Sequence, residues 1–433
     1  MLAGVLVFIL VAPATPLAPA TKPPSSRDVG RLVNEAATVE DALATARLLP
    51  LAGEETQHWE TQDVHIARRR KSLTALLRRV TRWTVGGAAA EARRGVLAND
   101  DFTRCMHLLA EPGPAEAYAA ERRDGLRLVA ALAQAPDALA PVAQDVDAAF
   151  RVALDELDGA PGATTGLHWA AKRCAAAGAP VATLDALGAA ESALRLPFRV
   201  HVNAVTLPGV GELAAALPLR ADTIATKSGA LVLERRRTAW LAEPGIGALA
   251  YSGKLMAPEP IPDAVRKIRD SVNGMLDAPK FDCALCNLYP AGEDAACKFH
   301  SDPEHGSHWH LSTAVVSCGE PRRFAFRRIG AEDDEHDRHS FHLFDGDVVE
   351  MFDNCQDIYQ HAVLAPEDAT TNQGARVSLV FKNALLLPSG KKGHGLPGSG
   401  TRSDRRKAKI KVAGDERPKP KPGRRRRRAT ASR

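Results

Sequence analysis

Residues 376–382 have the sequence Arg-Val-Ser-Leu-Val-Phe-Lys. Successive side chains of a β-strand point to opposite faces. Val377, Leu379 and Phe381 therefore share one face, and the other carries Arg376, Ser378, Val380 and Lys382. A buried cation needs an anionic partner. A dicarboxylate such as 2-oxoglutarate would supply it, because a guanidinium pairs with a carboxylate in bidentate fashion. The alternative is an ordinary edge strand on which Arg376 and Lys382 are solvated.

Histidines gather in the same part of the chain, since eight of the fourteen lie between Phe281 and Asn383. Among them are His300, two residues before Asp302, and the later His361. Residues two apart on a strand point the same way, and a second strand across a barrel mouth would bring His361 to them. Two histidines and one carboxylate hold one face of Fe(II) and leave three positions open for a cosubstrate and O₂. We therefore predict an iron site at these three residues.

The surrounding sequence has the spacing of a β-protein. After Leu196, short apolar stretches recur between turn signals, which is typical of an all-β sandwich or barrel. We expect one helix in this part, at Ile261–Leu276. The predicted strands lie at Arg199–Leu207, Gly229–Leu233, Phe281–Leu288, Leu311–Ser317, Arg323–Phe326, Phe341–Phe352 and Arg376–Phe381.

The first half of the chain has helical periodicity instead, from Asp28 to Leu194. Thr38 resembles the start of a capping box ahead of a helix at Ala42–Leu49, and apolar residues over Val146–Leu157 recur at helical spacing. We interpret this region as a helical bundle without chemistry of its own. The alternative is a helical array that binds a partner protein or nucleic acid.

The charge of the chain is divided unevenly. Residues 391–433 hold seventeen Lys and Arg against three acidic residues, a net charge of +14, which leaves −9 for the other 390 residues. After Leu387 the sequence is rich in Gly, Pro and basic residues and cannot bury a core, so we expect a disordered tail. Its run Arg424–Arg428 indicates a nuclear-localisation or nucleic-acid-binding segment, with a merely solubilising tail as the alternative.

Other features concern the compartment. Residues 1–20 carry no charge, and their apolar run Leu2–Ala12 has the length of a signal peptide but is too short to span a bilayer. We expect a cleaved targeting segment and linker over residues 1–26, with nuclear import through the basic tail as the alternative. No second apolar run approaches the roughly 20 residues that a span needs, so we expect no stable membrane insertion. Seven thinly spread cysteines favour a reducing compartment over a disulfide framework.

Several short segments in the second half occur in a specific order. They are Arg236–Trp240, Ala250–Gly253, Asn287–Tyr289, His300–Asp302, Arg322–Arg327, Leu343–Val348, Gln360–His361 and Arg376–Lys382. This order resembles that of AlkB-like Fe(II)/2-oxoglutarate dioxygenases, and the resemblance implies a double-stranded β-helix (jelly-roll) core. We expect an α+β protein with a targeting segment (1–26), a helical region (27–193), a dioxygenase domain (194–387) and a disordered basic tail (388–433).

The resemblance also implies roles for individual residues. It makes His300, Asp302 and His361 the ligands of Fe(II), and Arg376 the partner of the distal carboxylate of 2-oxoglutarate. Further contacts to the cosubstrate would come from Asn287, Tyr289, Ser378 and Lys382, and contacts to the substrate from Glu304 and Tyr251.

This chain departs from the family pattern in two places. The last motif usually reads R-x-N-x-T-x-R, whereas here the final three defined positions are Ser, Val and Lys, ending in Lys382. Lysine keeps the charge but loses the planar fork, so the affinity for 2-oxoglutarate should differ. The family often continues its H-x-D with acidic residues, but here Pro303 interrupts them and Glu304 remains. The three histidines in His305–His310 indicate either a surface loop or one that contacts substrate or handles protons.

Cysteines offer a second candidate metal site. Cys283 and Cys286, together with Cys297 and Cys318 or with the histidines of 305–310, have the ligand types of structural zinc. However, their spacing on a strand places the first two thiols on opposite faces. We interpret them as free cysteines of the core.

These observations together predict a dioxygenase that uses Fe(II), 2-oxoglutarate and O₂. The resemblance implies oxidative demethylation of N-alkylated bases in DNA or RNA, as in AlkB-like repair. One alternative is a protein side-chain hydroxylase or demethylase, which the acidic body favours. Another is a catalytically silent helical scaffold with an RNA-binding tail, against which the intact metal triad and Arg376 argue. We expect a monomer whose main partner is nucleic acid. A protein partner would bind the helical region if the alternative interpretation of that region holds.

Overall fold

The computed structural model describes residues 26–36, 38–49, 72–77, 96–97, 99–111, 115–133, 137–157, 159–225, 230–251, 254–293, 295–331, 333–334, 336–365 and 374–385. Residues 1–25 of the expected targeting segment and the whole of the expected basic tail lie outside these ranges. Predictions about both segments therefore remain predictions.

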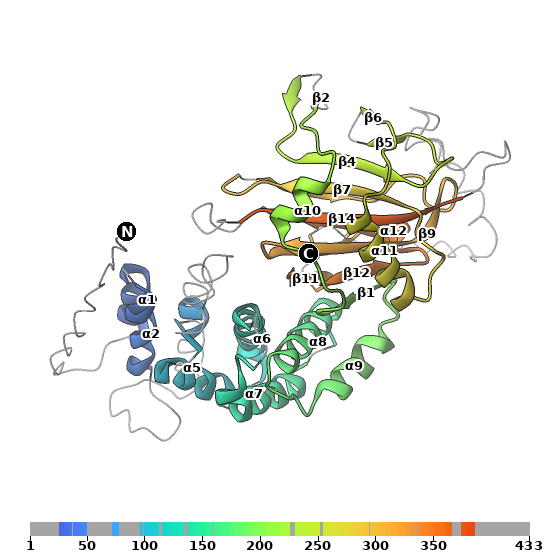
Figure 1. Cartoon of the computed structure of the whole chain (residues 1–433). Helices are drawn as coiled ribbons and strands as arrows, with labels where there is room; N and C mark the ends of the chain where they lie inside the picture. Colours follow the sequence, from blue (N-terminus) through green and yellow to red (C-terminus); the bar gives the residue numbers. More distant parts are fainter. Residues whose placement is uncertain are drawn as a thin grey trace, which may run out of the picture.

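Helices make up the described chain before residue 194. In Figure 1 they form a curved row that begins at α1, away from the strands, and ends at α8 and α9 beside them. Thr38 accepts a hydrogen bond from the Asp41 amide (3.1 Å) and so caps α2, as its side chain suggested. The elements are α1 (Ser26–Glu35), α2 (Val39–Ala44), η1 (Thr45–Leu48), α5 (Asp100–Ala110), α6 (Ala115–Leu132), η3 (Ala140–Val142), α7 (Ala143–Asp155), α8 (Pro161–Ala176) and α9 (Leu184–Ala193).

Two antiparallel sheets follow. The six-stranded sheet has the order β1-β12-β9-β14-β7-β4 and the four-stranded sheet the order β11-β10-β13-β8. Residues from the inner faces of both, such as Val315 and Met351 on one and Phe324 and Phe341 on the other, belong to one buried cluster, as in a jelly roll. The strands are β1 (Phe198–His201), β4 (Arg237–Ala242), β7 (Cys283–Tyr289), β8 (Cys297–His300), β9 (Trp309–Gly319), β10 (Arg322–Arg328), β11 (Arg338–Leu343), β12 (Val348–Met351), β13 (Tyr359–Val363) and β14 (Arg376–Ala384).

Strand β14 lies in the middle of the six-stranded sheet, between β7 and β9. Its apolar residues Val377, Leu379 and Phe381 pack into a cluster on the outer face of that sheet. Arg376 and Lys382 lie on the inner face and are 0% and 4% exposed. The predicted alternation is therefore confirmed, and the alternative of a solvated edge strand is wrong.

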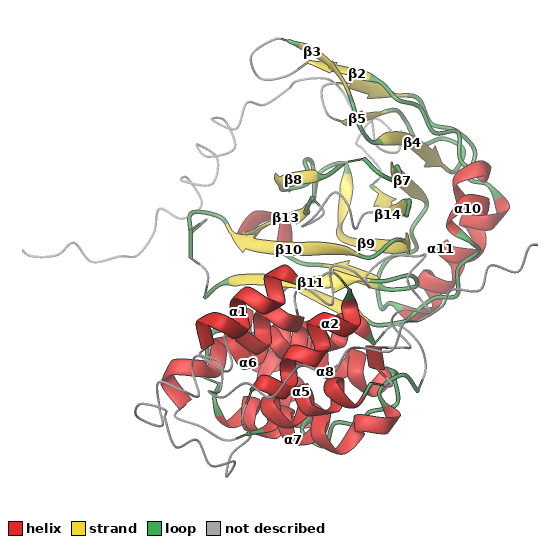
Figure 2. Cartoon of the chain, turned by 90° about the vertical axis from the view of Figure 1, so that its left-hand side faces the viewer, coloured by secondary structure: helices red, strands yellow, loops and turns green. Residues whose placement is uncertain are grey.

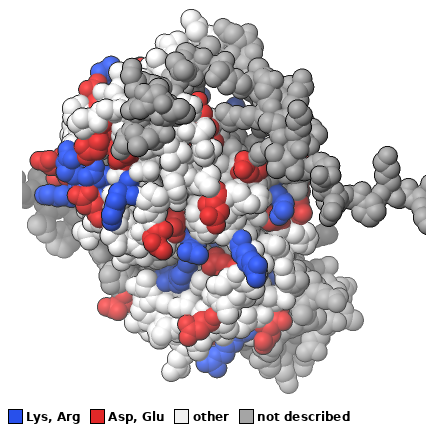
Figure 3. Space-filling view, turned by 90° about the vertical axis from the view of Figure 1, so that its right-hand side faces the viewer, with Lys and Arg blue, Asp and Glu red and all other residues white. Residues whose placement is uncertain are grey.

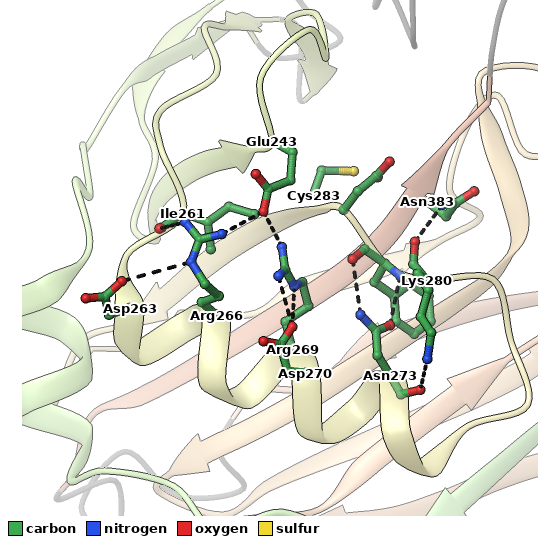
Figure 4. Close-up of polar contacts among 12 residues, drawn as sticks. Glu243, Ile261, Asp263, Arg266, Arg269, Asp270, Asn273, Lys280, Cys283 and Asn383 are labelled. Carbon is green, nitrogen blue, oxygen red and sulfur yellow. Dashed lines mark hydrogen bonds and ion pairs between the residues drawn. The ribbon is translucent and has the colours of Figure 1, made fainter.

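Helix α11 (Asp263–Met275) covers the outer face of the six-stranded sheet through Val265, Ile268 and Val272. Figure 4 shows how its polar side chains attach it. Glu243, which follows β4, accepts from Arg266 Nη1 (2.8 Å) and from Arg269 Nη1. These hydrogen bonds hold the pKa of Glu243 below its usual range. The helix agrees with the one predicted at Ile261–Leu276.

Helix α8 joins the helical region to the jelly roll. Trp169 stacks on Phe344 with ring centroids 6.3 Å apart, and Thr165 Oγ1 lies 2.8 Å from His339 Nδ1. Arg173 forms a buried ion pair with Asp347. One buried cluster consequently continues from the helices into the jelly roll. Figure 2 shows the helices of this N-terminal region gathered on one side of the strands, whereas α10 and α11 lie elsewhere. This content of helices and antiparallel sheets agrees with the predicted α+β class.

The apolar stretch Phe341–Phe352, predicted as one strand, is two strands. Strand β11 ends at Leu343 and β12 begins at Val348, in different sheets. Gly346 adopts a φ of +83° between them, which a residue with a Cβ rarely does. Asp347 stabilises the turn by accepting from the Phe344 amide (2.8 Å).

Small hairpins lie beyond β4 at the edge of the six-stranded sheet (Figure 1). One pairs β2 (Thr223–Ala225) with β3 (Leu231–Leu233), and the other pairs β5 (Leu249–Tyr251) with β6 (Lys254–Met256). A short helix, α10 (Val210–Ala216), precedes them, and another, α12 (Cys355–Ile358), precedes β13. Among the helices that the structure describes, none combines the length and apolar character that crossing a bilayer requires.

Candidate active site

The three predicted iron ligands meet at one end of the four-stranded sheet. His300 ends β8 and lies directly opposite His361 on β13, and Asp302 follows two residues after His300. Asp302 Oδ1 is 3.5 Å from His300 Nε2 and 3.8 Å from His361 Nε2. One ligand atom from each residue lies within 4.8 Å of the others. This is the ligand set of a facial triad, which leaves part of the coordination sphere to other ligands.

The two histidines are arranged to present Nε2. His300 Nδ1 lies 2.8 Å from the carbonyl oxygen of Lys298, which can only accept, so Nδ1 donates and Nε2 faces Asp302. Burial lowers the pKa of His300, but hydrogen bonds to Asp302 and Cys297 outweigh it and raise the pKa to about 11. Burial lowers the pKa of His361 to about 3. A metal ion would therefore take the place of a proton on one histidine and find the other neutral.

Asp302 is held from two sides. Its backbone amide donates to Gln356 Oε1 (2.9 Å), and Lys382 Nζ donates to its Oδ2 (2.6 Å). Burial would raise the pKa of this carboxyl, but Lys382 and both histidines hold it well below its usual range. The carboxylate stays ionised, with Oδ1 turned toward the histidines. Lys382 thus contacts an iron-ligand candidate, whereas the sequence predicted a contact to the cosubstrate.

Arg376 is a buried cation with unused donors. Its Nε donates to Ser317 Oγ (3.1 Å) and its guanidinium lies 5.2 Å from the centre of the Tyr289 ring. Its Nη1 and Nη2 are buried without a hydrogen-bond partner in the described structure. Burial lowers the pKa of this group. An unpaired buried guanidinium is costly, and a bound carboxylate would satisfy both nitrogens, so the residues here fit 2-oxoglutarate.

Three other predicted cosubstrate contacts surround Arg376 on the inner face of the sheet. Tyr289 lies directly opposite Arg376, and Asn287 directly opposite Ser378, in the pairing of β7 with β14. Asn287 Oδ1 accepts from Arg236 Nη1 (3.3 Å). The structure therefore places Tyr289, Asn287 and Ser378 together with Arg376. Lys382, the fifth residue named for the cosubstrate, lies at the other end of β14 and contacts Asp302 instead.

The predicted substrate contacts lie on different elements. Tyr251, at the end of β5, accepts through its hydroxyl from Arg236 Nη1 (2.9 Å). Glu304 adopts a φ of +65° in the loop after Asp302, and its Oε2 lies 3.8 Å from His308 Nδ1. In the same loop His305 Nε2 lies 2.9 Å from Thr313 Oγ1. This loop therefore lies beside the iron-ligand candidates, while Tyr251 approaches from the hairpins.

The cysteines do not form the alternative zinc site. Cys283 lies opposite Lys382 and Cys286 opposite Leu379, so the two thiols are on opposite faces of β7, as their spacing predicted. The seven cysteines all lie within described ranges, and no disulfide joins any of them. Within the described ranges, the residues that gather closely enough to hold a metal ion are those of the triad.

Sequence reasoning missed several residues that support the site. Ser317 accepts a hydrogen bond from Arg376, and Gln356 accepts one from the backbone amide of Asp302. Neither residue belongs to a motif that would have indicated its role from the sequence. Glu234, which contacts Arg236, and Lys254, which contacts Glu234, were missed as well. The alternation of β9 could have placed Ser317 on the inner face, but nothing local indicates the others.

Comparisons with known proteins agree with this geometry. Residues 217–382 match the family model described as the 2OG-Fe(II) oxygenase superfamily. The chain is 32% identical over 187 residues to the uncharacterised protein R406 of Acanthamoeba polyphaga mimivirus, covering 43% of this chain and 93% of that protein. A solved chain described as "The structure of OsALKBH1" is 15% identical, with a TM-score of 0.31, over 44% of this chain and 97% of that one. The family match and the viral relative show the broader family of which AlkB-like enzymes are a part: the chain belongs to the 2OG-Fe(II) oxygenase superfamily.

Proposed function

We propose that this protein is an Fe(II)/2-oxoglutarate-dependent dioxygenase that oxidatively demethylates N-alkylated bases of nucleic acid. The observation that carries the oxygenase part is the meeting of two half-sites. The triad of His300, Asp302 and His361 lies on one sheet and its loop, and the unpaired guanidinium of Arg376 lies on the facing sheet. A metal ion and a dicarboxylate would satisfy both at once.

The chain's own residues have separate tasks in this proposal. The triad holds the metal, and Lys382 keeps the Asp302 carboxylate ionised and turned toward the histidines. Arg376 binds the distal carboxylate of the cosubstrate, while its own position is fixed by Ser317 and Tyr289. Bound iron would supply the oxidation of a methyl C–H bond by O₂, coupled to decarboxylation of 2-oxoglutarate to succinate and CO₂. The hydroxylated methyl group would then leave the base as formaldehyde. The apolar inner faces of the sheets exclude water around these groups.

The choice of nucleic acid rests on the AlkB-like order of motifs and on the basic tail. A base in a duplex would have to be flipped out of the stack to reach the metal, whereas a single strand needs no such step. The hairpins beyond β4 carry exposed apolar side chains, with Leu231 74% and Leu233 66% exposed. Apolar side chains there would suit packing against a base that has been turned out of the stack.

A protein substrate is the second candidate. Figure 3 shows acidic and basic side chains intermingled on the face that it presents, without a broad basic patch. With a net charge of −9 outside residues 391–433, attraction to a polyanion must come from the tail or from a local patch. A protein substrate, which has no phosphate backbone, requires neither the basic tail nor such a patch for its attraction to the enzyme.

Mass spectrometry can decide between these candidates. The purified protein is incubated with Fe(II), 2-oxoglutarate and a panel of methylated oligonucleotides and peptides. We expect the mass of an oligonucleotide to fall by about 14 Da (one CH₂) with matching succinate, and no change with His300→Ala. Oxidation of peptides alone would support the protein-substrate candidate, and no succinate from any mixture would contradict the proposed oxygenase.

A further inference from the structure

A buried cluster of charged side chains connects the hairpins to the cosubstrate half-site. At its centre is Glu234, between β3 and β4, which is 6% exposed. Its Oε1 accepts from Arg236 Nη2 (2.6 Å) and its Oε2 accepts from Lys254 Nζ (2.8 Å). One carboxylate thus bridges two cations, one on each side of it.

Lys254, on β6, reaches three separate elements. Besides Glu234, its Nζ donates to Asp222 Oδ2 (2.7 Å), just before β2, and to Thr238 Oγ1 (2.7 Å), on β4. An ammonium group has three donors, and all three are used here. The two hairpins are therefore tied to each other and to the edge of the six-stranded sheet through this one side chain.

Arg236 carries the connection inward. The Nη1 atom donates to the Tyr251 hydroxyl (2.9 Å) and to Asn287 Oδ1 (3.3 Å), while Nη2 is held by Glu234. Asn287 is 3% exposed and lies on the inner face, opposite Ser378. Because its oxygen accepts from Arg236, the orientation of the amide is set. Among the described residues no acceptor is recorded for its Nδ2 group, which can donate to a ligand.

We propose that Glu234 and Lys254 are positioning residues that act through Arg236 to orient the Asn287 amide toward a carboxylate of 2-oxoglutarate. This inference rests on the proposed function, since it requires that the cosubstrate binds beside Arg376. It follows that a change in the position of the hairpins relative to the six-stranded sheet would change the affinity for 2-oxoglutarate. Neither residue contacts the triad, so metal affinity does not depend on them.

The structure offers a matched control in Glu243. Like Glu234, it bridges two cations, Arg266 and Arg269, but it lies on the outer side of the six-stranded sheet against α11 (Figure 4). Glu234→Gln and Glu243→Gln each remove one negative charge without changing the size of the side chain. Only the first should alter the cosubstrate site.

The test measures the affinities for 2-oxoglutarate and for Mn(II), which replaces iron, by isothermal titration calorimetry under anaerobic conditions. We expect Glu234→Gln to weaken 2-oxoglutarate binding by about tenfold, as for a weakened hydrogen bond to a charged group, and to leave Mn(II) affinity unchanged. Glu243→Gln should leave both affinities unchanged. In an Asn287→Ala background, Glu234→Gln should have no further effect on 2-oxoglutarate affinity, because the two act in series. Lys254→Gln serves as a second variant if Glu234→Gln does not fold.

Each outcome separates the two proposals. If the wild-type protein with Mn(II) does not bind 2-oxoglutarate, the proposed function fails. If the wild type binds but Glu234→Gln and Lys254→Gln bind equally well, the positioning role is wrong. A fully additive effect of Glu234→Gln and Asn287→Ala would likewise overturn the route through Asn287.

Discussion

The two sheets of the jelly roll contribute different halves of the site. The four-stranded sheet carries His300 and His361, which offer imidazole nitrogen ligands to a metal. The six-stranded sheet carries the buried cations Arg376 and Lys382, which suit anions. Asp302 is where the halves meet, because it lies near both histidines and accepts from Lys382. Metal binding and cosubstrate binding should therefore be separable by mutation.

Removing a histidine should have the largest effect. His361→Ala should abolish metal-dependent turnover of 2-oxoglutarate, because a facial triad has no spare protein ligand. Gln360→Ala is the matched control on the same strand, since Gln360 accepts from Arg327 Nε (3.0 Å) in the paired strand β10. Calorimetry with Mn(II) and a succinate assay check both variants. Near-native succinate production by His361→Ala would show that the triad assignment is wrong.

Removing Arg376, a buried cation of the six-stranded sheet, should have the second-largest effect. Arg376→Ala should raise the KM for 2-oxoglutarate, because a desolvated carboxylate loses its charged partner. The increase should correspond to a loss of about 2–5 kcal/mol of binding free energy. Mn(II) affinity should stay the same. Arg327→Ala, a cation that stacks on Phe299 (4.3 Å) instead, is the control. An unchanged KM in Arg376→Ala would show that the six-stranded sheet does not bind the cosubstrate through this residue.

A substitution at the meeting point should affect both halves, but less. Lys382→Met leaves the Asp302 carboxylate with one charged hydrogen bond fewer. We expect roughly fivefold weaker Mn(II) binding, about 1 kcal/mol, and a smaller change in the KM for 2-oxoglutarate than in Arg376→Ala. Lys382→Arg should be tolerated because it keeps the charge. A large increase in the KM for 2-oxoglutarate with unchanged metal affinity would instead support the cosubstrate contact that the sequence predicted for Lys382.

Removing residues 391–433 should have the smallest effect on the chemistry. Turnover of saturating substrate should persist, because every proposed iron and cosubstrate contact lies at or before Lys382. If the substrate is nucleic acid, affinity should fall, and the slope of log K against log salt should decrease by about 0.7–0.9 for each phosphate that the tail neutralises. Filter binding over a range of salt concentrations measures this. Equal slopes with and without the tail would exclude it from substrate binding.

The half-sites could be predicted from the sequence because each is encoded locally. The alternation in residues 376–382 places Arg376 on the inner face whatever the neighbouring strands are. The H-x-D spacing similarly places His300 beside Asp302. The break between β11 and β12 was missed, although the Asp-Gly pair ending at Gly346 is a turn signal.

Contacts between distant segments could not be predicted in this way. Lys382 and Asp302 are 80 residues apart, and their pairing depends on how the sheets face each other. Glu234 and Lys254 belong to no motif, so only the folded chain reveals that they support Arg236. Such long-range polar contacts depend on tertiary geometry rather than on local periodicity.

The most direct test of two separable half-sites is an anaerobic titration followed by visible absorption. Adding 2-oxoglutarate to the Fe(II)-loaded protein should produce a charge-transfer band, because the cosubstrate then chelates the iron. We expect the band in the wild type, its absence in His361→Ala, and its appearance only at much higher 2-oxoglutarate in Arg376→Ala. Absence of the band in the wild type, or the same titration curve in Arg376→Ala as in the wild type, would contradict the account.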